Sequence, residues 1–253
     1  MGKFFNRLCG ILMVWLLAGQ QPVQAADCAG TIYLTFTPGN MAQADTIARA
    51  LREEGVKATF LLANERTFRG DHALDASWGD YWRGLAAEGH VFGNHTFRHL
   101  YFKRDLPDGR VLASIDHNGP PTRLDAAEVC ADLQQTDDAF HALTGQRLSG
   151  LWRAPGTHLQ QRVADWAAHC GWTVHSPWEA AGLFGDELPS EKYPNDKLLK
   201  QALKQFGPGT VVMMHLGIRS RKDPLAPALA PLIRGLKAKG YCFAPLAAPL
   251  RTP

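Results

Sequence analysis

The stretch TIYLTFTPGNMAQADTIARALREEGVKATFLLA, residues 31–63, contains the alternation that decides the fold. It begins with a short apolar and β-branched run at Thr31–Phe36 and ends with a second such run at Ala58–Ala63. Between the two runs, three apolar residues recur at the spacing of one helix face: Ile47, Ala50 and Leu51. A strand, a helix and a second strand in this order predict a βα unit with a parallel sheet.

The same alternation continues through the rest of the chain. Five further runs are typical of strands: His90–Asn94, Gly150–Arg153, Thr173–His175, Thr210–His215 and Tyr241–Ala244. Helical spacing marks four further segments, within Val129–Leu143, Leu159–Ala167, Leu198–Phe206 and Leu232–Leu236. A glycine stands where a helix C-terminus needs a left-handed residue, at Gly55, Gly89, Gly145, Gly171 and Gly240. We predict one α/β domain, an irregular (β/α) barrel of about seven mostly parallel strands, either closed or open.

In such folds, ligands bind at the C-terminal ends of the strands. Tyr101–Arg123, rich in Pro, Gly and Asp, is the main irregular insertion, and we expect it on that side.

The first residues predict export. Lys3 and Arg7 precede the apolar run Leu8–Ala18, and Val23–Ala25 supplies small residues at a cleavage point, so residues 1–25 are typical of a signal peptide and 26–253 of the mature domain. An uncleaved anchor is the alternative. The run is shorter than a membrane span of ~20 residues and no later one is longer, so we expect no transmembrane body.

The predicted location is the periplasm or the outside of the cell. Cleavage would change the net charge of +3 to nearly neutral, which gives no electrostatic footprint for nucleic acid.

Four cysteines remain after the predicted cleavage: Cys28, Cys130, Cys170 and Cys242. Their spacings do not suggest a zinc-thiolate site, and an exported chain can oxidise them. The even count allows three pairings, or free buried thiols. We expect Cys28 to pair with Cys242, because both stand before or at the start of the first and last strands. Cys130 and Cys170 are harder to join, since they lie at opposite ends of two helices.

The strongest chemical signal is His95-Thr96-Phe97-Arg98-His99, which follows the strand His90–Asn94 directly. Two imidazoles four positions apart can share one face of a helical turn and bind a metal such as Zn²⁺. Two surface histidines are the alternative, but the position at a strand end favours the metal site.

Three motifs together resemble the polysaccharide deacetylases of the NodB-homology family. His-Thr-x-x-His at His95–His99 resembles the second motif of that family, and Arg153-Ala154-Pro155-Gly156 resembles the third. Met213-Met214-His215 resembles the fifth, which usually reads Leu-x-His. The order and spacing agree from about Thr31 to Ala244.

The resemblance implies a role for each matching residue. It implies His95 and His99 as ligands of a divalent metal, with Zn²⁺ as the expected ion, His215 as general acid, and Arg153 in the catalytic site. Trp178, Pro155 and Gly156 are implied at the substrate. The third metal ligand stays open, with His175 as a candidate that has an equal alternative role in packing.

Two motifs depart from the family. The first normally reads Thr-Phe-Asp-Asp-Gly-Pro, whereas this chain has Thr35-Phe36-Thr37-Pro38-Gly39-Asn40, so the general base and an acidic ligand are missing. The fourth is reduced to Val174-His175-Ser176-Pro177-Trp178 and lacks the Asp that orients Arg153. We expect either another acid beside Arg153 or exposure of this side chain, since a buried unpaired guanidinium is costly. Four carboxylates could substitute: Asp116, Glu179, Asp186 and Glu187.

Three functions remain open. The favoured one is an exported metal-dependent hydrolase that removes an acyl group from the amino sugars of a glycan. The alternative is a glycan-binding pseudoenzyme of the same fold, because loss of a general base typically lowers the rate ~10²–10⁴-fold. A purely structural α/β domain comes last, since it would leave three matching motifs to coincidence.

Overall fold

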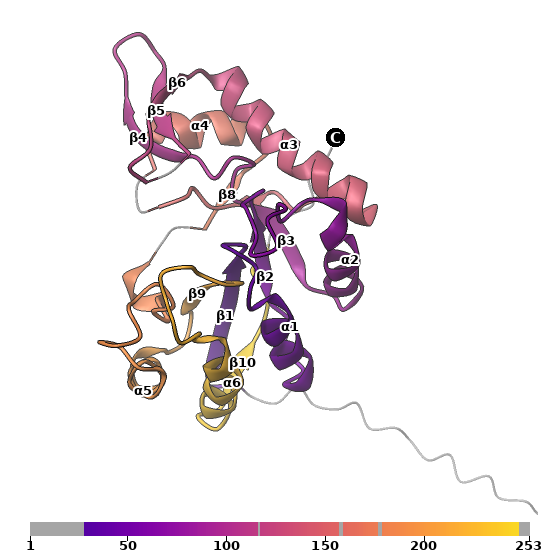
Figure 1. The fold of residues 1–253 in the computed structure, drawn as a ribbon, viewed down its shortest axis with the longest axis vertical. Coiled ribbons are helices and arrows are strands. Elements are labelled where there is room, and N and C mark those ends of the chain that lie inside the picture. The colour runs from indigo at the N-terminus through magenta and orange to yellow at the C-terminus, as the bar shows by residue number, and fades with distance from the viewer. Residues whose placement is uncertain (1–27, 116, 157–158, 177–178, 248–253) are drawn as a thin grey trace, which may run out of the picture.

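The computed structural model describes residues 28–115, 117–156, 159–176 and 179–247 (Figure 1). The predicted signal peptide lies outside these ranges. The strands of the main sheet are β1 (Gly30–Thr37), β2 (Thr59–Leu62), β3 (Val91–Asn94), β7 (Leu151–Trp152), β8 (Val174–His175), β9 (Val211–His215) and β10 (Tyr241–Phe243). The helices are α1 (Ala44–Glu53), α2 (Gly79–Ala87), α3 (Ala126–Thr144), α4 (Gln161–His169), α5 (Asn195–Gln205) and α6 (Leu229–Lys237).

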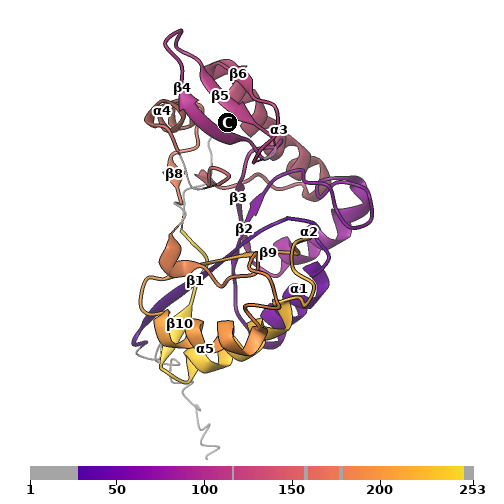
Figure 2. The same ribbon diagram turned by 60° about the vertical axis from the view of Figure 1, so that its left-hand side comes forward.

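The main sheet has seven strands, all paired in parallel, in the order β10-β1-β2-β3-β7-β8, with β9 also paired to β1. It curls into a half-barrel with helices outside it, which confirms the predicted single α/β domain with mostly parallel strands. Each of the seven predicted runs overlaps one of these strands. Figure 2 shows α5 and β10 at one end of the molecule and α3 and α4 at the other.

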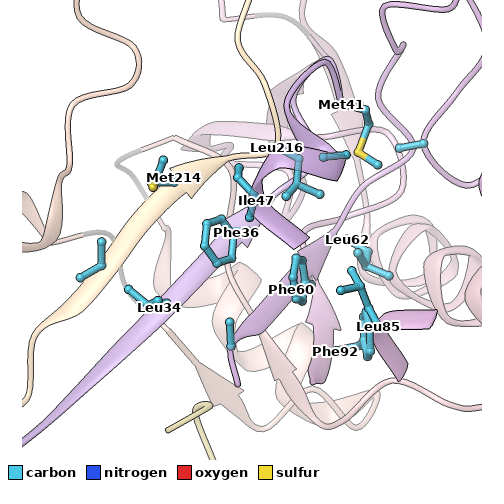
Figure 3. Packing of buried hydrophobic residues seen from close by; sticks show 14 of the residues in the cluster. Leu34, Phe36, Met41, Ile47, Phe60, Leu62, Leu85, Phe92, Met214 and Leu216 are labelled. Atoms are coloured by element: carbon cyan, nitrogen blue, oxygen red, sulfur yellow. The ribbon is translucent and has the colours of Figure 1, made fainter. Parts of the chain in front are cut away.

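The core lies between the sheet and the helices α1 and α2. Phe36, Phe60 and Phe92 stand on adjacent strands, with ring centroids 5.4 and 5.6 Å apart along the row (Figure 3). Ile47 of α1 and Leu85 of α2 close over this row and are almost fully buried. Burial of each such side chain stabilises the folded state by ~1.5–3 kcal/mol. This layer therefore holds in place the strands whose ends carry the polar residues of the site.

The glycines that were expected to end helices do so. Gly145 follows α3 with φ 75° and donates its N–H to the carbonyl of His141 at 2.8 Å. Gly55, Gly89, Gly171 and Gly240 also have positive φ between 62° and 93°. The helix Gly79–Ala87 was not among the segments read from apolar spacing, because Gly84 and polar residues interrupt its pattern.

The insertion is regular, which the sequence interpretation missed. It forms β4 (Tyr101–Asp105), β5 (Val111–Ser114) and β6 (Thr122–Leu124), an antiparallel sheet of three strands. Pro107, Asp108 and Gly109 form the turn between β4 and β5, while Phe102, Val111 and Ala113 pack into the core. The strands are short, so their alternation was hidden by the turn residues beside them.

Two disulfides link the described cysteines. Cys28 and Cys242 are bonded with Cα atoms 5.6 Å apart, as predicted, because β1 and β10 pair in parallel. Cys130 and Cys170 are also bonded, with Cα atoms 5.9 Å apart. The expectation that this pair is hard to join was wrong, because α3 and α4 pack side by side and bring the two positions together. None of the helices in the described part of the chain has the length and hydropathy of a membrane span.

Candidate functional site

The carboxyl ends of the parallel strands converge on one pocket. The pairing of β1 with β9 places Thr37 opposite His215, and β3 and β7 place Asn94 opposite Trp152. A cavity with a volume of about 270 Å³ opens at this edge. Seven candidate site residues named from the sequence line it: His95, His99, Arg153, Gly156, Asp186, Glu187 and His215.

His95 is held as a neutral ring. Its side chain is buried, and Nδ1 lies 2.8 Å from the backbone carbonyl oxygen of Arg153. A carbonyl can only accept, so Nδ1 carries the proton and Nε2 keeps a free lone pair. Burial, and then the nearby His99, hold the pKa of His95 well below its usual 6.5. The ring is therefore prepared to accept a hydrogen bond or to bind a cation through Nε2.

His99 reaches His95 through a tight turn. Thr96 and His99 have φ of 61° and 56°, and the two histidine ring centroids are 4.9 Å apart. The buried carboxylate of Asp132 holds the turn by accepting the backbone N–H of Phe97 at 2.7 Å. The prediction of a helical turn from the spacing was wrong, yet the two imidazoles still lie side by side.

His215 ends β9 and is paired with an acid from the loop before α5. Asp186 is 6% exposed, and its Oδ2 accepts the backbone N–H of His215 at 2.6 Å and lies 3.2 Å from Nδ1 of the ring. Glu187, largely exposed, has Oε1 at 3.5 Å from the ring Nε2. Burial acts to lower the pKa of His215, but Asp186, with smaller contributions from Glu187 and Glu65, outweighs it and raises this pKa to about 9. The imidazole is protonated at neutral pH.

Arg153 follows β7 and is buried, and no carboxylate of the described residues forms a hydrogen bond or ion pair with it. Its Nη2 donates to Oγ of Ser176 at 2.9 Å, its Nε to the carbonyl of Ser176 at 3.2 Å, and its Nη1 to Oγ1 of Thr35 at 3.0 Å. Burial lowers its pKa to about 10, opposed in part by Glu179, so it stays charged. Of the two expectations, exposure of the side chain was wrong, since Arg153 is 4% exposed. Over the described ranges its hydrogen bonds go to neutral oxygens, and the candidate acid Glu179 acts on it only through its charge.

The inserted sheet supplies a wall of the pocket. Tyr101 and His117 both line the cavity, and the Tyr101 ring lies 4.9 Å from the His99 ring and 5.6 Å from the His117 ring. Gly156 has φ 75°, and a Cβ atom at this position would come within 2.9 Å of the Tyr101 ring. Gly156 therefore makes room for Tyr101. Sequence reasoning missed Tyr101 and His117, although an aromatic residue two positions after His99 was a usable signal.

A family profile described as polysaccharide deacetylase matches residues 24–175, more than half of the chain. The chain belongs to the polysaccharide deacetylase family. Peptidoglycan-N-acetylglucosamine deacetylase of Bacillus cereus is 24% identical over 225 residues, which cover 86% of this chain and 83% of the relative. Chitooligosaccharide deacetylase of Bradyrhizobium is 25% identical over 239 residues, which cover 87% and 91%.

The fold agrees with solved structures of this family. A mutant of a family pseudoenzyme from Bacillus anthracis, described as having restored enzymatic activity, superposes with a TM-score of 0.64 at 20% identity. The match covers 88% of this chain and 67% of that one. At this identity the likeness shows the shared deacetylase fold.

The segment that corresponds to the first deacetylase motif lies at the pocket and carries no acid. Thr37 is buried at the pocket wall, and Pro38 follows it with no side-chain oxygen. A carboxylate from the segment after β2 holds this loop, since Oε2 of Glu65 accepts the N–H of Gly39 at 2.9 Å. Sequence reasoning did not single out Glu65, which comes three residues after the end of β2.

Deacetylases of this family are generally metal-dependent. His95 and His99 provide two imidazoles, whereas zinc sites use three or four protein ligands. Among the described residues, no three His, Cys, Asp or Glu side chains are grouped so that they could hold a metal ion. The described part of the site therefore does not fit a complete metal centre of the family type.

The remaining predicted site residues lie beside the pocket or outside the described ranges. His175 does not line the cavity; its Nε2 accepts the N–H of Ala154 at 3.3 Å, and burial followed by Arg153 lowers its pKa to about 4. Pro155 is buried next to Gly156, and Glu179 is exposed. Trp178 and Asp116 lie outside the described residues.

Proposed function

We propose that this protein is an exported, deacetylase-like hydrolase that acts on the N-acyl amide of amino sugars in a glycan. The observation that carries the proposal is the Asp186–His215 pair at the edge of the pocket. A protonated imidazole with a pKa of about 9 can give a proton to a departing amine. We assign the catalytic roles to His215 and Arg153.

The chemistry needed is amide hydrolysis. The oxygen of a water molecule bonds to the acyl carbon as this water loses a proton to solvent, the C–N bond breaks, and the sugar nitrogen takes up a proton. His215 supplies this proton, and Asp186 stabilises the charged ring before the transfer. Arg153, already satisfied by neutral oxygens, orders the pocket floor, and its carbonyl orients His95.

The glycan binds along the strand ends. Tyr101 offers an aromatic surface of the kind that packs against sugar rings. Family position supports Trp178, Pro155 and Gly156 at the substrate. Relatives named as peptidoglycan and chitooligosaccharide deacetylases support an amino-sugar polymer as the ligand class.

Export is supported by the cysteines. Two disulfides are stable in oxidising compartments and rare in the cytosol. With the predicted signal peptide at residues 1–25, they support a periplasmic or secreted location.

We assign His95 and His99 as the residues that would hold a divalent cation, with Zn²⁺ as the best match to imidazole ligands. Two neutral ligands predict weak binding of the cation. The proton transfer proposed for His215 does not depend on a bound cation.

A second candidate, glycan binding without turnover, is favoured by Thr37 and Pro38. A threonine cannot take a proton from water near neutral pH, so we expect a rate ~10²–10⁴-fold below that of relatives with an acid there. A solved pseudoenzyme of this fold is described as regaining activity in a mutant. In this chain, the double substitution Thr37→Asp and Pro38→Asp would supply the two acids that the first motif lacks.

One experiment separates the candidates. Purified protein, His215→Ala and the Thr37→Asp/Pro38→Asp variant are incubated with chitooligosaccharides and peptidoglycan fragments, and both binding and acetate release are measured. Slow release by the wild type that His215→Ala abolishes supports the hydrolase. If the wild type binds the glycan but releases no acetate, and only the double variant releases acetate, the result supports the pseudoenzyme. Absence of both binding and release in all three proteins would refute the proposal.

A further inference from the structure

Arg221 is a second buried guanidinium and lies outside the family motifs. It is 5% exposed and stands in the segment after β9. Its Nη2 donates to the carbonyl of Tyr193 at 2.8 Å and to Oδ1 of Asn195 at 2.6 Å, while Nη1 donates to the carbonyl of Leu188. Within the described ranges, none of these partners is a carboxylate. A buried charge with three neutral acceptors on one segment indicates a fixed structural task.

The segment to which Arg221 donates its hydrogen bonds also contains Asp186. Leu188, Tyr193 and Asn195 all belong to the loop 185–194 or the start of α5, and Asp186 lies two residues before Leu188. Arg221, Asp186 and His215 also line one small cavity with a volume of about 150 Å³.

Other contacts between the two segments are weaker. Asn195 Nδ2 donates to the carbonyl of Pro224 at 2.9 Å, and Ser190 Oγ accepts the N–H of Asp223 at 3.3 Å. The Lys222–Glu191 ion pair is exposed, and such surface pairs contribute little. Arg221 is therefore the one buried charged side chain among these contacts.

We propose that Arg221 is a positioning residue that holds the loop 185–194 so that Asp186 stays in contact with His215. The importance of that contact for catalysis rests on the proposed function, but the contact itself does not. Arg221 does not touch the ring, so it acts through the loop backbone. A loop of this length without helix or strand has many conformations, and the three hydrogen bonds select one of them.

The protonation of His215 reports on this contact. The groups that act on the ring are Asp186, Glu187 and Glu65, which favour its charged form, while His95 lies across the pocket. Removing the positive charge of Arg221 would by itself raise the pKa of His215, because like charges disfavour each other. Loss of position would instead lower this pKa, because Asp186 would leave the ring. The two effects have opposite signs.

The test is an NMR titration of ¹³C,¹⁵N-histidine-labelled protein without glycan. The His215 signals, among ten histidines, are assigned with His215→Gln. The proteins are wild type, Arg221→Gln and the matched control Lys222→Ala, which removes the neighbouring exposed cation. In Arg221→Gln we expect the pKa of His215 to fall by about one unit or more, whereas Lys222→Ala leaves it unchanged.

An unchanged or raised His215 pKa in folded Arg221→Gln would overturn the proposal. If this variant does not fold, Asn195→Ala decides, because it removes one acceptor and keeps the guanidinium. A lowered His215 pKa in Asn195→Ala supports positioning, and an unchanged value overturns it. Because the titration needs no substrate, its result is independent of whether the protein hydrolyses glycans.

Discussion

Oδ2 of Asp186 accepts the backbone N–H of His215 at 2.6 Å and lies 3.2 Å from Nδ1 of its ring, although 29 residues separate the two. One carboxylate thus fixes both the strand end and the protonation of the imidazole. The acid comes from the loop before α5, whereas the segment of the fourth motif, which lacks the acid of the family, provides Ser176 to Arg153. The proposed proton donor therefore has a carboxylate partner, while the acids of the first motif are absent from the sequence.

Replacing Asp186 with Asn should lower stability in a pH-dependent way. The folded pKa of His215 is raised to about 9 from 6.5, so the pair stabilises the fold fully below pH 6.5 and this contribution is lost as pH rises through 9. We expect a loss of at most ~3 kcal/mol at pH 6 and little loss at pH 10, measured by urea unfolding. Asp80→Asn, fully exposed, is the control. Equal losses at both pH values would contradict the assignment.

Acid should destabilise the protein through its buried histidines. The pKa values of His90 and His175 are lowered to about 4, in both cases mainly by burial, and that of His95 also lies well below 6.5. A lowered folded pKa gives stability that is present above pH 6.5 and lost as pH falls toward 4. The free energy of unfolding should therefore decrease between pH 6.5 and 5, less steeply in His90→Gln. A flat profile in the wild type over this interval would show that these rings are not held neutral.

Zinc binding should be weak and should depend on His95. Calorimetric titration of the wild type, His95→Ala and Pro38→Asp tests this, with the expectation that His95→Ala abolishes binding. Pro38→Asp should tighten it ~10-fold or more, because an anionic oxygen adds a ligand. Tight wild-type binding that survives His95→Ala would place the metal elsewhere. Tight binding that needs His95 would point to a further ligand and to an active, rebuilt site.

Truncation of Tyr101 should weaken glycan binding. Its ring lines the pocket between His99 and His117, so Tyr101→Ala removes an aromatic contact with a sugar and should cost ~1 kcal/mol, about fivefold in affinity. Phe68→Ala is the matched control, since Phe68 is 57% exposed and does not line the pocket. Affinities for chitooligosaccharides would be measured by calorimetry, and equal losses in both variants would argue against a specific sugar contact.

Both disulfides should be found by peptide mapping without reduction. Removing Cys130–Cys170 by double substitution to Ala should lower the free energy of unfolding by ~2–4 kcal/mol, because the bond closes a 40-residue loop in the unfolded chain. Free thiols at these positions in the purified exported protein would contradict the pairing.

The sequence by itself determined the order of the strands along the chain, the glycines that end helices, the pairing of Cys28 with Cys242, and the placement of His95, His99 and His215 at strand ends. These features depend on local periodicity, backbone conformation and parallel topology, which short segments encode. Tertiary structure alone decided that Asp186 meets His215, that Ser176 and Thr35 satisfy Arg153, and that Tyr101 enters the pocket. Each of these contacts joins segments far apart in the chain. The folded backbone sets the distance between the two residues, and no local sequence pattern predicts that distance.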